Sequence, residues 1–312
     1  MTATIPRATT PISAALLAST QAVHSHIFTV DVEEYFQVNA FDGLIERSRW
    51  HEQPSRLEAS VDEVLSVLAR FDTVGTFFTL GWIAERHSAL VRRIAEAGHE
   101  IASHGWWHRK VGTMSPNEFR EDVRSSKQIL EDVSGRQVRG FRAPSFSIAP
   151  GGEWAFDILL EEGYSYDSSL FPIRRPGYGY PGAPREPHLV HRDAGALMEL
   201  PLTTTSLLGA RVPAAGGGYL RHFPFQIIQR AFREHEQRRI PAVFYIHPWE
   251  LDADQPRLPV SASVRLRHYA GLHRTKSRIE RLLQEFAFTS VERRMSASLA
   301  ATGPTSLGML PA

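Results

Sequence analysis

The sequence HIFTVDV, residues 26–32, decides the fold class because it is the first of several short β-branched and aromatic runs that alternate with helical patterns. Such runs favour strands, and their alternation with helices favours a parallel sheet. The other strand candidates are residues 75–80, 100–103, 138–141, 164–166, 198–202 and 242–246. Strands of this number and spacing predict an α/β fold with about seven parallel strands, in the form of a distorted (β/α) barrel or a strongly curved sheet.

Helical patterns and loops separate these strand candidates. One helical pattern has apolar residues at Val61, Val64 and Leu68, and another runs from about Ser88 and is closed by Gly98. The remaining predictions are a helix from about residue 223, a helix over residues 265–284, a strand over residues 286–291, and two loops over residues 172–188 and 214–218.

The composition excludes several classes of protein. The 312 residues, of which 42% are hydrophobic and 22% charged, suit one large globular domain. A formal net charge of +1 gives no basis for binding nucleic acid and favours a ligand close to neutral. No stretch reaches the ~20 apolar residues of a membrane span, so no integral membrane segment is expected. Because the chain has no cysteine, any metal must be held by His and carboxylate side chains.

Polar side chains follow directly after most of the predicted strands. The carboxyl ends of parallel strands meet at one mouth of a barrel, where catalytic residues of such folds lie. Single polar residues at strand ends are ordinary solvated positions, but their repetition over five strands predicts a shared site. The residues concerned are Asp31, Glu33, Glu34, His104, His108, Arg142, Asp167 and His247.

A metal site is predicted from the pair His104 and His108, because residues i and i+4 of a helical turn share one face. In the run of acids after the first strand, the strand period of two places Asp31 and Glu33 on the same side, whereas Glu34 points elsewhere. Two His and one carboxylate leave coordination positions open, which is the catalytic arrangement, and the second carboxylate is then free to act as a base. The alternative interpretation is a set of exposed surface side chains.

Two further residues fit a hydrolytic site. Arg142 could hold a carboxylate in a two-pronged contact that keeps it ionised and oriented. His247 follows an apolar run, and Asp167 could orient it and raise its pKa, which would make it a proton donor near neutral pH.

At these residues the sequence resembles the polysaccharide deacetylase family, also called the NodB-homology or carbohydrate esterase family 4 group. The resemblance runs from about His26 to Trp249 and rests on GTFFTLG at residues 75–81 and EAGHEIASH at residues 96–104. The runs DVEEYF and YDSSLFP, with residues 268–291, look like the subgroup found with exosortase and exopolysaccharide loci. The resemblance implies a barrel of the NodB-homology type.

The resemblance also implies roles for individual residues. Asp31 would be the general base, oriented by Arg142, and His247 would be the general acid. Asp167 would lie in the motif lining the other wall of the groove. The metal ligands would be Glu33, His104 and His108.

The chain departs from the family pattern at two motifs. The first motif usually has two adjacent Asp residues, so Glu34 stays an alternative to Glu33 as the ligand. Ser145 stands where an aromatic residue is usual, and its backbone N–H could still donate to an oxyanion.

The implied cofactor is one divalent metal ion, with Zn²⁺ expected and Co²⁺, Ni²⁺ or Fe²⁺ as alternatives. The implied substrate is an N-acetylated polysaccharide, either an exopolysaccharide or its precursor, with peptidoglycan and chitin oligosaccharides as alternatives. Tyr178 and Tyr180, with Arg174 and Arg175 beside them, could stack against sugars at the groove edge. Association with an exopolysaccharide assembly system is a further expectation.

Two other functions stay open at this point. In the first, Asp31 and Glu33 are the paired carboxylates of a glycosidase, which leaves the histidines without a role. In the second, the chain is an inactive carbohydrate-binding or scaffold protein.

Domain boundaries follow from the resemblance and the composition. We expect a disordered tail over residues 1–24, the deacetylase domain over 25–255, a family-specific extension packed on the barrel over 256–295, and a second disordered tail over 296–312. The first twenty residues do not have the pattern of a secretory signal. The expected location is therefore the cytoplasm or the periphery of a membrane.

Overall fold

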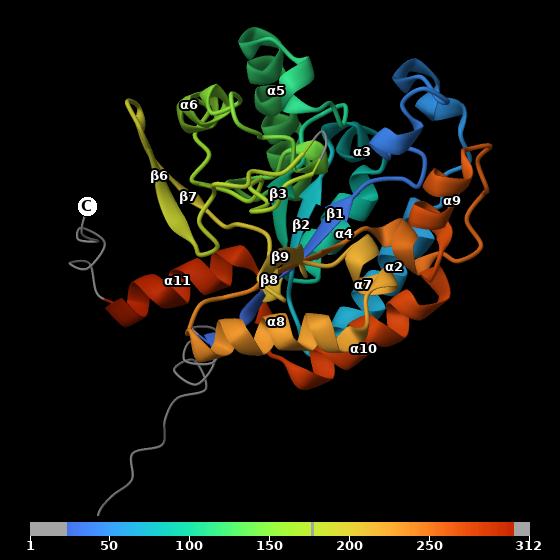
Figure 1. The fold of residues 1–312 in the computed structure, drawn as a ribbon. Helices are drawn as coiled ribbons and strands as arrows, with labels where there is room; N and C mark the ends of the chain where they lie inside the picture. The colour runs from blue at the N-terminus through green and yellow to red at the C-terminus, as the bar shows by residue number, and fades with distance from the viewer. Residues whose placement is uncertain (1–23, 176–177, 303–312) are drawn as a thin grey trace, which may run out of the picture.

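Seven parallel strands form the centre of the structure, a computed structural model that describes residues 24–175 and 178–302 (Figure 1). This arrangement confirms the predicted α/β barrel. In spatial order the strands are β10 (Val243–Ile246), β1 (His26–Val32), β2 (Thr76–Thr79), β3 (Glu100–Ser103), β4 (Gly140–Phe141), β5 (Tyr166–Asp167) and β7 (Gly195–Glu199).

The two faces of β1 show why this sequence forms an inner strand. Every residue of β1 is buried. Phe28 and Val30 belong to the larger apolar core, which also takes in the inner faces of the helices, whereas Ile27 belongs to a second, smaller core. Since side chains alternate along a strand, Thr29 and Asp31 share the face of Ile27. The alternation therefore turns a carboxylate toward the barrel interior.

Helices form the outer layer around these strands (Figure 1). Helix α5 shows the local signals that set its ends: Ser115 and Glu118 make a capping box, and Gly135 takes the left-handed conformation after the last turn. The layer consists of α2 (Leu57–Arg70), α3 (Gly81–Arg86), α4 (Ser88–Glu96), α5 (Pro116–Ser134), α6 (Trp154–Glu161), α7 (Gly218–His222) and α8 (Phe225–Gln237).

Irregular backbone completes the ring between β7 and β10. The Thr203 hydroxyl donates to the carbonyl of Val243 at 2.8 Å and accepts from its N–H at 2.7 Å. The N–H of Tyr245 donates to the carbonyl of Ala215 at 2.7 Å. Strands β7 and β10 do not pair with each other, so these contacts take the place of a hydrogen-bonded ladder between them. The barrel is distorted at this point.

Two antiparallel hairpins were not predicted from the sequence. The first pairs β6 (His188–Arg192) with β7, and the second pairs β8 (Thr204–Leu207) with β9 (Ala210–Pro213). Strands β6 and β8 are short and only partly buried, so they lack the apolar run or alternation that identifies a strand.

The predicted helix over residues 265–284 is wrong, because two helices occupy this segment. Helix α9 (Ala262–Tyr269) and helix α10 (Thr275–Glu285) are separated by Gly271, whose φ of 77° ends the first. Strand β11 (Phe288–Thr289) then pairs with β1, which ties the C-terminal segment to the central sheet.

The predicted tail from residue 296 is also corrected. Helix α11 (Val291–Thr302) includes the first seven residues of this predicted tail, in keeping with their helix-forming Ala and Leu. Residues 1–23 and 303–312, which were predicted as tails, lie outside the described residues. Among the residues that the structure describes, no helix is long and apolar enough to cross a membrane.

Candidate active site

The carboxyl ends of the strands bring the predicted site residues together. Asp31 is the last inward-facing residue of β1, and Glu33 follows directly after the end of this strand. His104 follows β3, Arg142 follows β4 and His247 follows β10. The four acidic and imidazole side chains from β1 and β3 are at most 3% exposed. The site is therefore a buried polar cluster at one mouth of the barrel.

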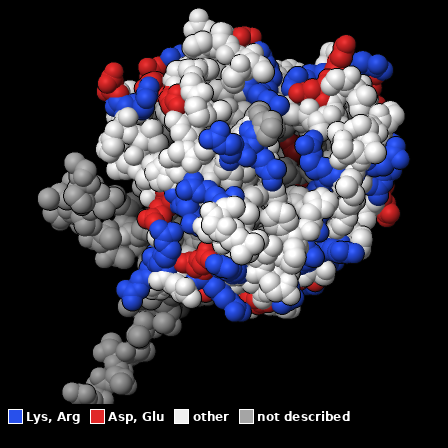
Figure 2. Space-filling view, viewed as in Figure 1, with Lys and Arg blue, Asp and Glu red and all other residues white. Residues whose placement is uncertain are grey.

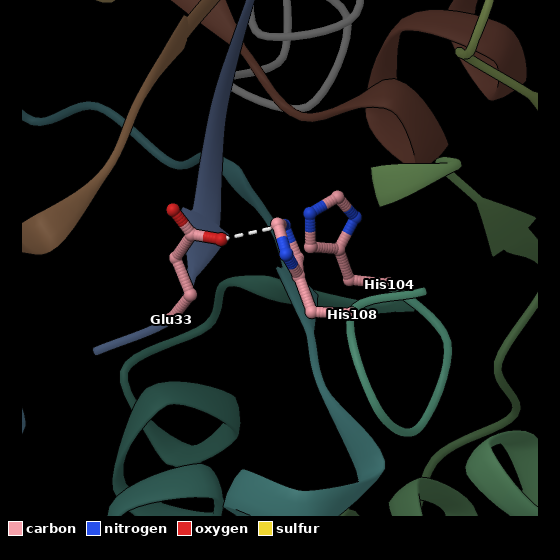
Figure 3. A group of neighbouring side chains, drawn as sticks. All are labelled: Glu33, His104 and His108. Carbon is pink, nitrogen blue, oxygen red and sulfur yellow. Dashed lines mark ion pairs between the residues drawn. The ribbon is translucent and has the colours of Figure 1, made fainter. Parts of the chain in front are cut away.

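Three of these residues form a candidate metal centre. Glu33, His104 and His108 each offer one ligand atom, and these atoms lie within 4.8 Å of one another. The Nε2 atom of His108 lies 2.7 Å from Oε2 of Glu33 (Figure 3). Glu34 instead accepts hydrogen bonds from the Ser55 hydroxyl and the backbone N–H of Arg56. Of the two acids that the sequence left open, Glu33 is the one that faces the imidazoles.

The loop that carries the two imidazoles is not the helical turn expected from their spacing. Gly105 and His108 both have positive φ, at 74° and 51°. Asp122 of α5 accepts from the backbone N–H of Trp106 at 2.8 Å, and a Cβ at Gly105 would lie 2.6 Å from the same carboxylate. The turn is thus held by a long-range contact, yet it still brings the two rings to 5.3 Å between centroids.

The protonation states of this centre suit a cation. His104 Nδ1 donates to the carbonyl of Arg142 at 2.8 Å, which leaves Nε2 with a free lone pair. Burial lowers the pKa of His104 to about 4, so the ring is neutral at pH 7. Although burial raises the pKa of Glu33, the imidazoles of His108 and His247 outweigh it and hold that pKa well below its usual range. Two imidazoles and an ionised carboxylate are a fitting donor set for Zn²⁺.

Asp31 is held by a buried arginine. Nη1 of Arg142 donates to Oδ1 of Asp31 at 2.6 Å and to the Thr29 hydroxyl at 2.7 Å. The guanidinium also donates to the carbonyl and the hydroxyl of Ser168 and lies 4.1 Å above the Phe78 ring. These contacts fix the orientation of the carboxylate. The two-pronged contact predicted for Arg142 is wrong, because only Nη1 donates to Asp31 and the other nitrogens donate to Ser168.

Replacing Arg142 with Met is expected to destabilise the fold by roughly 3–5 kcal/mol, since it leaves the Asp31 carboxylate buried without its partner. Urea denaturation of the two proteins measures this difference. The matched control is Arg49→Met on the exposed pair with Glu52, where little stability should be lost. Equal losses at the two positions would contradict the structural role of Arg142.

The imidazole of His247 faces the two carboxylates with one nitrogen. Its Nε2 lies 3.6 Å from Oε1 of Glu33 and 4.0 Å from Oδ2 of Asp31. Its Nδ1 lies 2.8 Å from Oε1 of Glu250, and Oε2 of the same carboxylate accepts from Nε of Arg221 at 2.8 Å. The prediction that Asp167 orients His247 is therefore wrong, because Glu250 takes this role.

Charge around His247 sets its protonation. Burial lowers the pKa of this imidazole, but the Glu33 carboxylate and the hydrogen bond with Glu250 outweigh burial and raise it to about 9. His247 is therefore protonated at neutral pH, as a proton donor requires.

The free energy of unfolding of the metal-free protein should fall as the pH rises from about 6.5 to about 9. A folded-state pKa above the unfolded value of 6.5 contributes stability that is complete below pH 6.5 and disappears as the proton is lost near pH 9. Denaturation at several pH values after chelator treatment measures the slope, and His247→Gln should flatten it. An equal slope in the two proteins would contradict the assignment.

Asp167 lies behind the site rather than in it. Its carboxylate accepts from the N–H and the hydroxyl of Ser169, and that hydroxyl accepts from the N–H of Ala143 at 2.8 Å. Burial and the charge of Asp167 raise the pKa of Glu199, so this buried pair of acids holds a proton. Asp167 is thus a positioning residue for the turn that holds Arg142.

The predicted substrate-binding residues lie on loops around the mouth. Ser145, with φ of 56°, donates its hydroxyl to Oδ1 of Asn39 at 2.5 Å. The Tyr178 and Tyr219 hydroxyls are 2.8 Å apart, and the Tyr180 hydroxyl donates to Glu153 at 2.6 Å. Both predicted tyrosines are therefore anchored at their hydroxyls.

Sequence reasoning missed the residues that support the site from the C-terminal half of the chain. Trp249 donates its indole N–H to Oε1 of Glu33 at 3.0 Å, and its ring stacks 4.3 Å from that of His268. Arg221 donates to the carbonyls of His268 and Ala270. The run HPWE at residues 247–250 contained Glu250 and Trp249, but nothing in that run indicated their partners.

Two family models match the chain. The polysaccharide deacetylase model matches residues 51–150, which include His104, His108 and Arg142. A domain of unknown function, DUF3473, matches residues 168–296, which include His247. Asp31 and Glu33 lie before both matches.

Curated relatives match part of the chain. The peptidoglycan-N-acetylglucosamine deacetylase of Bacillus cereus is 32% identical over 133 residues, covering 39% of this chain and 48% of that protein. The chain spans less than half the length of the first curated relatives that it matches.

Solved structures share the fold over most of the chain. A putative polysaccharide deacetylase from Mycobacterium smegmatis is 18% identical with a TM-score of 0.60, covering 93% of this chain and 96% of that one. Puue allantoinase, also 18% identical, has a TM-score of 0.57 and covers 89% of this chain and 90% of that one. At these identities the likeness shows a common fold.

Proposed function

Because the chain contains a polysaccharide deacetylase domain, we propose that it is a metal-dependent hydrolase that removes N-acetyl groups from the N-acetylhexosamine units of a polysaccharide. The observation that carries the proposal is the convergence of Glu33, His104 and His108 beside Asp31 and His247. A metal site, a base and an acid within one buried cluster are the parts that amide hydrolysis needs.

The proposed metal ligands are Glu33, His104 and His108, and Zn²⁺ is the proposed ion. When bound, such an ion lowers the pKa of a water toward ~7 and polarises the acetamide carbonyl. A glycosidase built on Asp31 and Glu33 would leave both imidazoles without a role, and Glu33 already contacts His108 and Trp249.

The residues of the chain then supply the proton transfers. Asp31, kept in place by Arg142, takes the proton of the attacking water as the C–O bond forms. The backbone N–H of Ser145 is the proposed donor to the oxyanion. His247, held at Nδ1 by Glu250, delivers a proton from Nε2 to the departing amine as the C–N bond breaks. Acetate and a free hexosamine unit result.

We propose an exopolysaccharide or its precursor as the substrate, because the subgroup resemblance in the sequence favours it. Peptidoglycan and chitin oligosaccharides stay alternative substrates, because some relatives are named as peptidoglycan or chitooligosaccharide deacetylases. A location in the cytoplasm or at the periphery of a membrane, and association with an assembly system, stay predictions.

Acetate release across a panel of polymers tests the proposal. The panel comprises an N-acetylated exopolysaccharide, peptidoglycan and chitin oligosaccharides, and each reaction is also analysed for new reducing ends. Acetate with matching free amines supports the deacetylase. New reducing ends without acetate would identify a glycosidase, and no product from any polymer would favour a scaffold.

A further inference from the structure

A basic groove lies at the side of the candidate active site. The groove has a volume of about 500 Å³, and its lining includes Lys110, Ser147, Arg174, Arg175 and Tyr178. Ligand sites commonly enclose about 300–1,000 Å³. Three of the lining residues are cationic and none is acidic. Figure 2 shows Lys and Arg side chains gathered around the middle of one face of the molecule.

In the part of the chain that the structure describes, the three cations of this groove have no carboxylate beside them. About half of the other exposed arginines do have one, as Arg124 faces Glu162 and Arg192 faces Asp157. Within residues 24–175 and 178–302, Lys110, Arg174 and Arg175 make no ion pair. The chain has a formal charge of only +1, so the excess of positive charge in the groove is local. The net charge favoured a ligand close to neutral because it does not show this local excess.

Both walls of the groove connect to the catalytic cluster. On one wall, Lys110 is two residues from His108, and the N–H of Val111 donates to the Ser147 hydroxyl at 3.0 Å. On the other wall, Tyr178 contacts Tyr219, which follows the glycine turn packed on Tyr245. The ring of Tyr245 lies 5.5 Å from that of His247. A polymer that enters the active site along this side therefore passes the cations.

We propose that this groove binds acidic sugar units next to the N-acetylhexosamine that is deacetylated, so that the substrate class is an acidic N-acetylated polysaccharide. This inference rests on the proposed function. Guanidinium groups pair with carboxylates through two parallel hydrogen bonds, and Tyr178 offers a ring against which a sugar can pack. Cations on separate segments of an open groove suit carboxylates repeated along a polymer better than one compact phosphate.

A pair of matched oligosaccharides tests the inference by direct binding. The first alternates N-acetylglucosamine with glucuronate, and the second is the same oligosaccharide with each carboxyl reduced to a hydroxymethyl group. Fluorescence anisotropy should show about tenfold tighter binding of the acidic form at low salt, and the difference should shrink as salt screens the charges. Equal binding of the two forms would overturn the inference.

Variants locate the effect in the groove. The double variant Arg174→Gln with Arg175→Gln should lose most of the preference for the acidic form. The control is Arg136→Gln, which lies between α5 and β4 and lines a separate pocket with Glu100 and Glu292. A preference that persists in the double variant, or that falls equally in the control, would overturn the inference. Thermal denaturation checks that each variant is folded.

Two further measurements separate the possible failures. Stronger competition by uridine diphosphate N-acetylglucosamine than by the acidic oligosaccharide would assign the groove to phosphate and overturn the inference. Acidic preference without acetate release from any polymer would contradict the proposed function and leave the groove as an acidic-glycan site. Acetate release without a preference for the acidic form would contradict the proposed role of the groove but not the proposed function.

Discussion

Replacement of Asp31 by Asn is expected to lower the rate of acetate release by at least ~10²-fold while the protein still binds its metal. Asn has nearly the same shape as Asp, and its side-chain oxygen can still accept from Nη1 of Arg142. It cannot accept the proton of the attacking water. The three proposed ligands are untouched, so kcat should fall without loss of bound metal.

Steady-state acetate release together with the metal content of the purified variant measures both parts of this prediction. Asp62→Asn, on a surface ion pair with Arg93, is the matched control and should keep its activity. If Asp31→Asn releases acetate at the normal rate, Asp31 is not the base.

Replacement of His247 by Gln is expected to lower kcat by about 10²- to 10⁴-fold. The charged imidazole supplies the proton that turns the leaving nitrogen into an amine, and the amide side chain of Gln cannot supply it. Because Nδ1 of His247 is held by Glu250, removal of the ring should leave the metal ligands in place. The loss should therefore appear in kcat, with the metal content unchanged.

His191→Gln, at the exposed position of β6, is the control for His247 because it removes an imidazole outside the proposed site. It should leave acetate release unchanged. An undiminished kcat in His247→Gln would show that another group protonates the amine.

Much of the barrel could be predicted because its strands are buried on both faces. Runs such as HIFTVDV are apolar and β-branched for that reason, and glycines mark where the helices end. The hairpins of β6 with β7 and β8 with β9 lie at the edge of the barrel, where half-exposed strands carry no such pattern. The break at Gly271 depends on packing against the backbone of Arg221, which no local pattern contains.

The site residues could be predicted because the carboxyl ends of parallel strands converge whatever the sequence between them. Their partners could not be predicted in the same way. Asp167 and Glu250 are both acids near a strand end, and only the folded chain shows that Glu250 lies against His247. The contact between Arg221 and Glu250 joins residues 29 positions apart, and the contact between Glu33 and Trp249 joins residues 216 apart.

The C-terminal segment takes part in the architecture of the site through these contacts. His268 stacks on Trp249, whose indole N–H holds Glu33, and Arg221 links the end of α9 to Glu250. Strand β11 adds a second connection by pairing with β1, the strand that carries Asp31. The region matched by DUF3473 therefore contributes to the same site as the region matched by the deacetylase model.

Acetate release by metal-free protein, before and after Zn²⁺ is restored, tests the central claim that Glu33, His104 and His108 form the metal centre of an N-deacetylase. The substrate is the N-acetylated polymer that gives the highest rate in the panel. The account predicts no acetate from the metal-free protein, recovery when about one Zn²⁺ is bound per chain, and no recovery in His104→Gln. Undiminished acetate release by the metal-free protein would contradict it.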